Sequence, residues 1–239
     1  MRINKFFTEN GFCSRREADR LIEAGRVKIN QSIAKLGDQL KDSDQVFLDD
    51  KLMEVKKKTP IVIAYNKPVG IECTSDPRIA NNIISAVNFP ERLVHIGRLD
   101  VMSEGLILLT NLGDIVNKIL RRRYGHEKEY VVVFDNPLTP AILRHLSHGV
   151  DIGDEEGPTA PCQVEQIGGS RIKIILTEGR NRQIRRMAEA VGLRVMRLKR
   201  IRVMNIELGD LKKGSWRKLS KAELSSLIKQ LPTDDSADY

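Results

Sequence analysis

The 239-residue sequence is poor in cysteine and has no long hydrophobic run, and each shortage excludes a class of protein. Three cysteines are too few, and odd in number, for a disulfide-stabilised scaffold, so we expect a reducing compartment. No stretch approaches the ~18 consecutive apolar residues that a membrane helix needs. The first nine residues lack the apolar core of a secretory signal. These shortages predict a cytoplasmic protein with no membrane association.

Metal-binding spacings are also missing from the sequence. Neither Cys-x-x-Cys nor His-Glu-x-x-His occurs, and His145 and His148 lie three residues apart without further ligands nearby. We therefore expect no metal. Apolar residues make up 41% of the chain and charged residues 30%, so the chain can bury a core and is not a disordered segment.

Positive charge is concentrated in one segment of the chain. The net charge is +8, from 40 Lys and Arg against 32 Asp and Glu. Residues 171–202 hold eleven basic side chains against only Glu178 and Glu189, a net charge of +9, so the remaining residues together carry −1. Apolar residues interleave with the basic ones, which favours a folded segment over a tail. Such a basic stripe is typical of proteins that contact phosphate backbones; the alternative is a solvated surface.

The chain is expected to divide near residue 58, where a lysine run ends at Pro60 in a linker. In the first part, one helix is predicted over 3–9, and a second begins at the N-cap Ser14 and ends at Gly25. Short strands follow, over 27–29 and 45–48. A unit of this size is too small to be an enzyme by itself.

After residue 58 the pattern is rich in strands, with helices between them, which predicts an α/β or α+β domain. The expected strands cover 61–66, 106–110, 130–134, 171–177 and the run 195–208. The expected helices cover 114–120, 139–146 and 222–231, and a further one begins at the cap Asn181 and ends at Gly192.

The helix after Asn181 combines an apolar stripe with an arginine cluster. Its apolar residues follow the i, i+3, i+4, i+7 pattern of a buried helix face. The spacing predicts that Arg182, Arg185 and Arg186 lie together on another face. Arginines at a helix N-terminus oppose the helix dipole, so a bound anion or a carboxylate partner is expected there. Pairing with surface acids is the alternative.

Asp100 is the candidate catalytic residue. An isolated aspartate in a loop is more often a turn residue. Here glycines flank the loop at Gly97 and Gly105, Arg98 is close by, and an apolar strand follows. A carboxylate held in a loop between strands can act as a nucleophile, a base or a metal ligand.

Four segments together resemble the motifs of the pseudouridine synthases, in the order in which that family carries them. They are Lys67-Pro68-Val69-Gly70, Gly97-Arg98-Leu99-Asp100 with Ser103, the segment 126–130 and the segment 178–187. The N-terminal residues, with the segments 14–18 and 25–30, resemble an S4 RNA-binding domain. The combination points to the RsuA branch of the family. The segments 126–130 and 181–187 look closest to the RluF-like members of that branch, which modify ribosomal RNA of the large subunit.

The resemblance implies an α+β fold and a set of residue roles. An S4 domain of the αL type is expected over 1–58, and over 59–239 a catalytic domain with a central mixed, mostly antiparallel sheet flanked by helices. Asp100 would be the nucleophile, Tyr130 would pack on the target base and take part in proton transfer, and Arg185 would pair with Asp100. The residues expected to contact the RNA or to support the extruded base are Arg98, Leu99, Val101, Arg182, Gln183, Ile184, Arg186, Leu198 and, in the S4 domain, Arg15 and Arg16.

The implied reaction converts an RNA uridine to pseudouridine without a cofactor. The expected substrate is ribosomal RNA, in a stem-loop of the large subunit, with a transfer RNA as a further candidate and small-subunit ribosomal RNA as an alternative. The expected enzyme is a monomer in which Arg182 and Arg186 affect the salt dependence of RNA binding and Arg185 affects catalysis. A rival hypothesis from another class is a non-catalytic S4-type RNA-binding protein, in which Asp100 has no chemical role.

Overall fold

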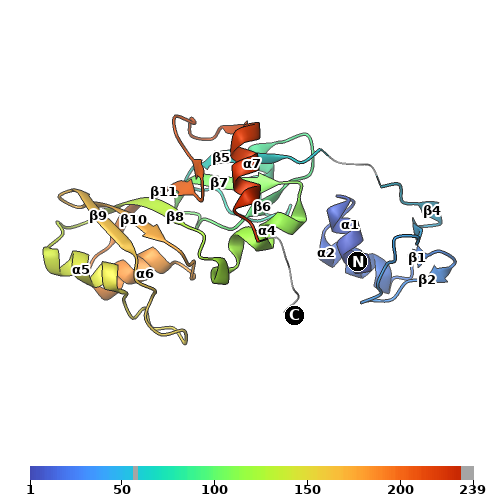
Figure 1. Cartoon of the computed structure of the whole chain (residues 1–239), viewed down its shortest axis with the longest axis horizontal. Helices are drawn as coiled ribbons and strands as arrows, with labels where there is room; N and C mark the ends of the chain where they lie inside the picture. The colour runs from blue at the N-terminus through green and yellow to red at the C-terminus, as the bar shows by residue number, and fades with distance from the viewer. Residues whose placement is uncertain (56–58, 233–239) are drawn as a thin grey trace. The chain divides into compact units, whose positions relative to one another are not determined.

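The computed structural model describes residues 1–55 and 59–232 (Figure 1). These residues fall into two compact units: 1–61 together with 111–114, and the remainder of the chain. The predicted linker lies mostly outside the described residues, at 56–58. In the part of the chain that is described, no helix is both long enough and apolar enough to cross a membrane.

The N-terminal unit consists of two helices and a small sheet. Helix α1 (Ile3–Glu9) and helix α2 (Arg15–Glu23) confirm the two predicted helices. The Ser14 hydroxyl accepts the Glu17 N–H at 3.2 Å, and Gly25 takes a left-handed φ of +68° after α2, as its sequence pattern predicts. The four-stranded sheet has the order β2-β1-β3-β4, with β1 (Val27–Ile29), β2 (Ser32–Ile33), β3 (Val46–Leu48) and β4 (Lys51–Leu52).

Apolar side chains from both helices form the core of this unit against the sheet. The buried members are Ile3, Phe6, Phe7, Ala18, Ile22, Val27, Ala34 and Val46. Because they come from α1, α2 and the strands in turn, this unit has a complete core of its own.

The larger unit is built on a nine-stranded sheet. Its strand order is β13-β5-β7-β11-β8-β10-β9, with β12 paired to β11 and β6 paired to β7. The strands are β5 (Val62–Lys67), β6 (Val94–Ile96), β7 (Glu104–Thr110), β8 (Lys128–Phe134), β9 (Gln163–Gly168), β10 (Arg171–Leu176), β11 (Val195–Val203), β12 (Ile206–Glu207) and β13 (Trp216–Lys218). Among these strands only β7 and β11 pair in parallel, so the predicted mixed, mostly antiparallel sheet is confirmed.

Helices cover this sheet at both of its ends (Figure 1). They are α3 (Ile83–Val87), α4 (Gly113–Leu120), the 3-10 helix η1 (Arg122–Tyr124), α5 (Pro140–His148), α6 (Gln183–Ala190) and α7 (Lys221–Lys229). Helices α5 and α6 pack on β8 and β10 around buried residues such as Leu146, Met187, Ile172 and Val132. This packing fixes α6, and with it the turn that precedes α6, against the sheet.

Close approach of β7 and β11 places a strict demand on Gly105. A Cβ atom at this position would lie 2.2 Å from the carbonyl oxygen of Arg200 and 2.8 Å from its amide nitrogen. Gly105 also has φ +104°, which side chains other than that of glycine rarely allow. The strand that follows the Asp100 loop can therefore join the sheet only because residue 105 is glycine.

The predicted helix cap at Asn181 is wrong. Helix α6 begins at Gln183, and its N-cap is Arg182, which has a left-handed φ of 50° and no side-chain cap. The side-chain oxygen of Gln183 instead accepts the N–H of Arg180 at 3.0 Å. The acceptor that organises the turn thus comes from within the helix.

Several elements with weak sequence signals were not predicted, among them β9, α3, β6 and β13. Strand β9 is mostly exposed and polar, so it shows no alternation of apolar residues. Helix α3 has five residues, too few for a 3.6-residue period to stand out. Strands β6 and β13 have three residues each and complete the sheet through pairing with β7 and β5.

Candidate active site

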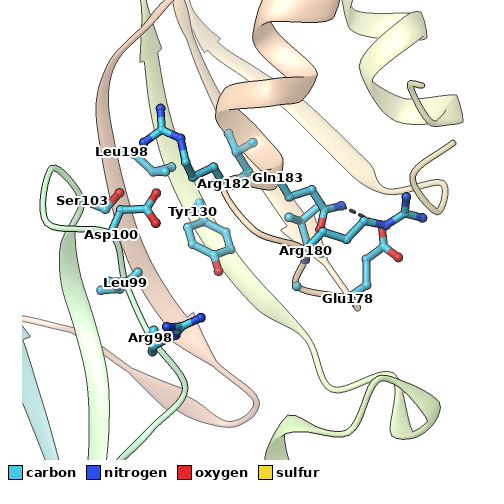
Figure 2. A pocket seen from close by; sticks show the side chains of 13 residues that line it. Arg98, Leu99, Asp100, Ser103, Tyr130, Glu178, Arg180, Arg182, Gln183 and Leu198 are labelled. Carbon is cyan, nitrogen blue, oxygen red and sulfur yellow. Dashed lines mark hydrogen bonds and ion pairs between the residues drawn. The ribbon is translucent and has the colours of Figure 1, made fainter. Parts of the chain in front are cut away.

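A cleft opens on the larger unit beside strands β8 and β11, between the Asp100 loop and the turn before α6 (Figure 2). It consists of two adjoining cavities, and the larger has a volume of about 990 Å³. Residues that line both cavities are Arg98, Leu99, Asp100, Tyr130, Gly179, Arg180 and Arg182. The motif around Asp100 and the segments 126–130 and 178–187, far apart along the chain, therefore meet at this cleft.

Two hydrogen bonds hold the loop that carries Asp100. The Leu99 N–H donates to Cys73 Sγ at 3.3 Å, and the Gly70 N–H donates to the Val101 carbonyl at 2.9 Å. The carboxylate of Asp100 keeps 32% of its side-chain surface exposed. The segment after β5 thus fixes the loop through Gly70 and Cys73, while the Asp100 carboxylate stays accessible to a ligand.

Arg185 connects α6 to the same loop. Its Nη2 donates to the Met102 carbonyl at 2.9 Å and to Ser103 Oγ at 3.3 Å, and its Nε lies 3.7 Å from Asp100 Oδ2. Burial lowers the pKa of Arg185, and the Asp100 charge opposes that effect. The Nε–H group is buried and has no hydrogen-bond partner. A charged donor therefore faces the carboxylate at ion-pair distance, in the pairing that the sequence resemblance implies.

Tyr130 stands beside the Asp100 carboxylate in the cleft (Figure 2). Strand β8 presents it next to Arg200 of β11 and Ile174 of β10. Apolar walls complete the smaller cavity through the buried side chains of Leu198 and Ile184. This arrangement of one carboxylate, one aromatic ring and apolar walls suits a flat heterocyclic base.

The turn before α6 is organised by a buried glutamate. Glu178 Oε1 accepts Gln183 Nε2 at 2.8 Å and the Ala160 N–H at 3.1 Å, and Arg122 Nη2 lies 2.5 Å from Oε2. The Arg180 side chain, only 3% exposed, donates to Asp154 Oδ1 at 2.9 Å. This wall of the cleft is therefore held by internal charge pairs.

The predicted clustering of the three arginines on one helix face is wrong. Arg182 lies outside the helix and is exposed at the cleft, and Arg185 faces the Asp100 loop. Arg186 points elsewhere: its Nη1 lies 3.1 Å from Asp154 Oδ2, and its Nη2 donates to the Ile152 carbonyl. The left-handed turn at Arg182 breaks the helical spacing on which the prediction depended.

The other predicted contact residues fall into two groups. Val101, like Arg98, is exposed at the cleft. Arg15 and Arg16 lie exposed on the first turn of α2 in the N-terminal unit, outside the residues that line the cleft. Among the described residues, no group of three or more His, Cys, Asp or Glu is placed to hold a metal ion.

Two cationic residues that line the cleft were not predicted from the sequence. Lys128 and Arg200 line the larger cavity, and Arg200 is 4% exposed. Strand periodicity could have found them, because Lys128 lies two residues before Tyr130 and Arg200 two residues after Leu198, each on the same strand face. Lys67, the lysine of the first motif, is fully buried, and its Nζ donates to the Pro68 and Ile71 carbonyls at 2.9 and 2.8 Å.

Replacing Lys128 by methionine should stabilise the larger unit. Burial, with the nearby Arg200 charge, lowers the pKa of Lys128 from 10.5 to about 8, which corresponds to roughly 3 kcal/mol of penalty on the charged form. Loss of the hydrogen bond to the His126 carbonyl costs about 1 kcal/mol. We expect Lys128→Met to raise the free energy of unfolding at pH 7 by about 1–2 kcal/mol.

The pH dependence of that difference has a defined sign. Between pH 8 and 10.5 the unfolded chain binds more protons at Lys128 than the folded chain, so wild-type stability rises with pH in this window. The advantage of the variant should therefore be complete below pH 8 and fade toward pH 10.5. Urea unfolding followed by fluorescence of the single tryptophan, Trp216, measures it. A lower free energy of unfolding for Lys128→Met than for the wild type at pH 7 would contradict the view that the charged Lys128 destabilises the fold.

Comparison with known proteins agrees with this geometry. Residues 61–190 match the family model of RNA pseudouridylate synthase, and residues 1–46 match that of the S4 domain. The chain is 45% identical, over 99% of its length and 81% of the relative, to the dual-specificity RNA pseudouridine synthase RluF of Escherichia coli strain K12. It is 34% identical to the ribosomal large subunit pseudouridine synthase B of Bacillus subtilis strain 168, over 95% of both chains.

A solved structure gives the same result. The crystal structure of a pseudouridylate synthase superposes with a TM-score of 0.70 at 30% identity, covering 95% of this chain and 99% of that one. The family match covers the unit that contains Asp100 as well as the S4 domain, which decides against a protein that only binds RNA. The chain belongs to the RNA pseudouridylate synthase family, is an RNA pseudouridine synthase with an N-terminal S4 domain, and is similar to RsuA-type members.

Proposed function

We propose that this enzyme isomerises a uridine of large-subunit ribosomal RNA, presented in a stem-loop, with Asp100 as the nucleophile. The observation that carries the proposal is the meeting of Asp100 and Tyr130 at one cleft with an arginine-rich rim, with Arg185 at ion-pair distance from Asp100. The names of the relatives support the class of RNA: one is a ribosomal large-subunit enzyme and one is called dual-specificity. That second name supports a transfer RNA as a further candidate substrate.

The reaction needs no group beyond the side chains in the cleft. The bond between C1′ of the ribose and N1 of the uracil breaks, a bond from C1′ to C5 forms, C5 loses its proton and N1 gains one. In this proposal Asp100 forms a transient covalent bond to the nucleotide. Tyr130 packs on the base and takes part in the proton transfer. Arg185 keeps the carboxylate in place through its contacts with Met102 and Ser103.

The uridine must leave its stack to reach Asp100, which costs a few kcal/mol. Arg98 and Arg182 are exposed on opposite sides of the cleft entrance (Figure 2). Guanidinium groups there can contact phosphates and stack on the neighbouring bases, which offsets part of that cost. Leu99, Val101, Ile184 and Leu198 would form the apolar contacts of the extruded base.

Pseudouridine mapping on defined transcripts tests the class of RNA. Unmodified transcripts of large-subunit ribosomal RNA, small-subunit ribosomal RNA and pooled transfer RNAs are incubated separately with the full chain. We expect pseudouridine in the first, with a transfer RNA as the second substrate. Modification of the small-subunit transcript alone would overturn the choice of RNA and leave the enzyme class intact.

Three arginine variants should separate RNA binding from catalysis. Arg182→Gln should weaken RNA binding and reduce the slope of log K against log salt by about 0.7–0.9, the value for one phosphate contact. Arg186→Gln should change that slope by much less, because Arg186 is already paired with Asp154. This revises the sequence-based expectation that both arginines act alike. Arg185→Gln should lower kcat about 10²-fold with a small change in affinity.

Filter binding at four salt concentrations, together with single-turnover rates, measures all three variants. An unchanged slope in Arg182→Gln would remove that residue from the RNA contact. A variant Arg185→Gln that lost affinity but kept kcat would mean that Arg185 binds RNA and does not position Asp100.

The S4 unit would bind the RNA through Arg15 and Arg16, which are exposed on the first turn of α2. A ribosomal RNA substrate in turn supports a cytoplasmic location. Deleting residues 1–58 should lower RNA affinity more than it lowers kcat at saturating RNA, and unchanged affinity would contradict the anchoring role.

A further inference from the structure

Arg200 is a buried cation without a counter-charge. It lies in β11 beside Tyr130 of β8, is 4% exposed, and lines the larger cavity of the cleft. Its Nε donates to the Leu106 carbonyl at 2.7 Å, whereas its Nη2 is buried with no hydrogen-bond partner. Within residues 1–55 and 59–232, no ion pair joins Arg200 to a carboxylate.

Lys128 adds a second cation at the same place. Its side chain also lines the larger cavity, and its Nζ donates to one acceptor, the His126 carbonyl at 3.0 Å, although an ammonium group has three donors. Arg200 lowers the pKa of Lys128 by charge repulsion, second to burial itself. The two cations therefore lie close enough to repel each other at a site that is partly shielded from water.

The carboxylates around the cavity do not neutralise this pair. Asp100 faces Arg185, and Glu156 is paired with Arg122. Glu72, the remaining acid of the lining, is exposed. Charges removed from water without partners are costly, so a buried arginine and a half-buried lysine lining one cleft indicate that an anion belongs there.

We propose that Arg200 Nη2 and Lys128 Nζ bind a phosphate oxygen of the RNA strand beside the flipped uridine. The inference rests on the proposed function, because that function brings an RNA strand into the cleft. When a nucleotide turns out of the stack, its own phosphates move with it. Guanidinium and ammonium groups are the side chains that bind phosphate oxygens most strongly. The positive charges of Arg200 and Lys128 would then be neutralised only when the RNA strand is bound.

A purely structural role for Arg200 is the alternative. Its bond to the Leu106 carbonyl joins β11 to β7, and that bond alone could explain its burial. It does not explain the unpartnered Nη2 or the presence of Lys128 in the same cavity wall.

Ligand titration of the full chain tests the site without any catalysis. The chain is labelled with ¹⁵N-arginine, and the Nε–H signal of Arg200 is identified by its loss in Arg200→Lys. We expect this signal to shift on addition of the trinucleotide UpUpU, to shift with inorganic phosphate at higher concentration, and to remain in place with uridine, which has no phosphate. No shift with UpUpU, or an equal shift with uridine, would overturn the proposal.

A second test uses Lys128→Met, which is expected to remain folded. On the large-subunit transcript we expect about fivefold to tenfold weaker binding and a salt slope smaller by about 0.7–0.9. Lys212→Met removes an exposed lysine from outside both cavities and should match the wild type. An unchanged affinity and slope in Lys128→Met would count against the site.

Failure of the anion site and failure of the proposed function give different results. If the wild-type chain modifies none of the transcripts, the proposed function fails, and the UpUpU titration still decides on Arg200. If the wild-type chain modifies RNA but UpUpU leaves the Arg200 signal unchanged, the anion site alone is wrong.

Discussion

Asp100→Asn is expected to abolish pseudouridine formation, with a loss of at least about 10³-fold in the single-turnover rate. The amide has nearly the shape of the carboxylate but lacks the charged oxygen that forms the bond to the nucleotide. RNA affinity should change by less than about threefold, because the exposed arginines at the cleft and the S4 unit remain. Chromatographic separation of pseudouridine from uridine in a nucleoside digest of the large-subunit transcript measures the first, and filter binding measures the second.

A charge-matched control is available in Asp210→Asn. Asp210 is an exposed aspartate in the loop after β12 and lies outside the lining of both cavities. It should retain full activity. Appreciable product from Asp100→Asn would show that another group is the nucleophile. Loss of RNA binding in that variant would instead mean that Asp100 shapes the loop.

The sequence was sufficient to predict the elements whose signals are local. Ser14 caps α2 through its own hydroxyl, and Gly25 ends the helix by its own backbone freedom. The resemblance around Asp100 and Arg185 likewise led to a pair that lies at ion-pair distance. In each case the residues in the motif carry the information themselves.

Features that depend on distant partners could not be predicted in this way. Arg186 differs from Arg185 only in the loop that it meets, and Asp154 is more than thirty positions away in sequence. The cap of α6 failed for a related reason, because Gln183 supplies the acceptor that Asn181 was expected to supply. Strand β9 is exposed along most of its length, so few of its side chains need to be apolar and no alternation results.

The cleft also shows a conflict between stability and function. Lys67 and Arg200 are buried and Lys128 is half-buried near Asp100, and desolvation lowers the pKa of both lysines. Lys67 is hydrogen-bonded to two carbonyls, whereas Lys128 and Arg200 keep unused donors. A fold optimised for stability would have apolar residues in place of Lys128 and Arg200. Their presence beside the proposed nucleophile fits a site that gains its full set of contacts only with RNA bound.

Gly105→Ala is expected to destabilise the larger unit by roughly 3–5 kcal/mol and to remove activity. A Cβ atom would lie 2.2 Å from the Arg200 carbonyl oxygen, and this neighbour is backbone within a paired strand, so it cannot turn away. The left-handed φ of +104° adds strain of its own. Since Gly105 follows the Asp100 loop directly, relief of the clash must move either that loop or β11.

Gly169→Ala is the matched control for this prediction, because Gly169 lies in the same unit, a Cβ atom there meets nothing within 4 Å, and its φ lies outside the left-handed range. Gly169 lies in the turn between β9 and β10, and the variant should be neutral or slightly stabilising. Urea unfolding followed by Trp216 fluorescence reports on the larger unit, in which Trp216 lies. If Gly105→Ala unfolded at the wild-type urea concentration and kept its activity, β7 and β11 would be able to move apart without loss of stability or activity. The Asp100 loop would then not depend on their close pairing.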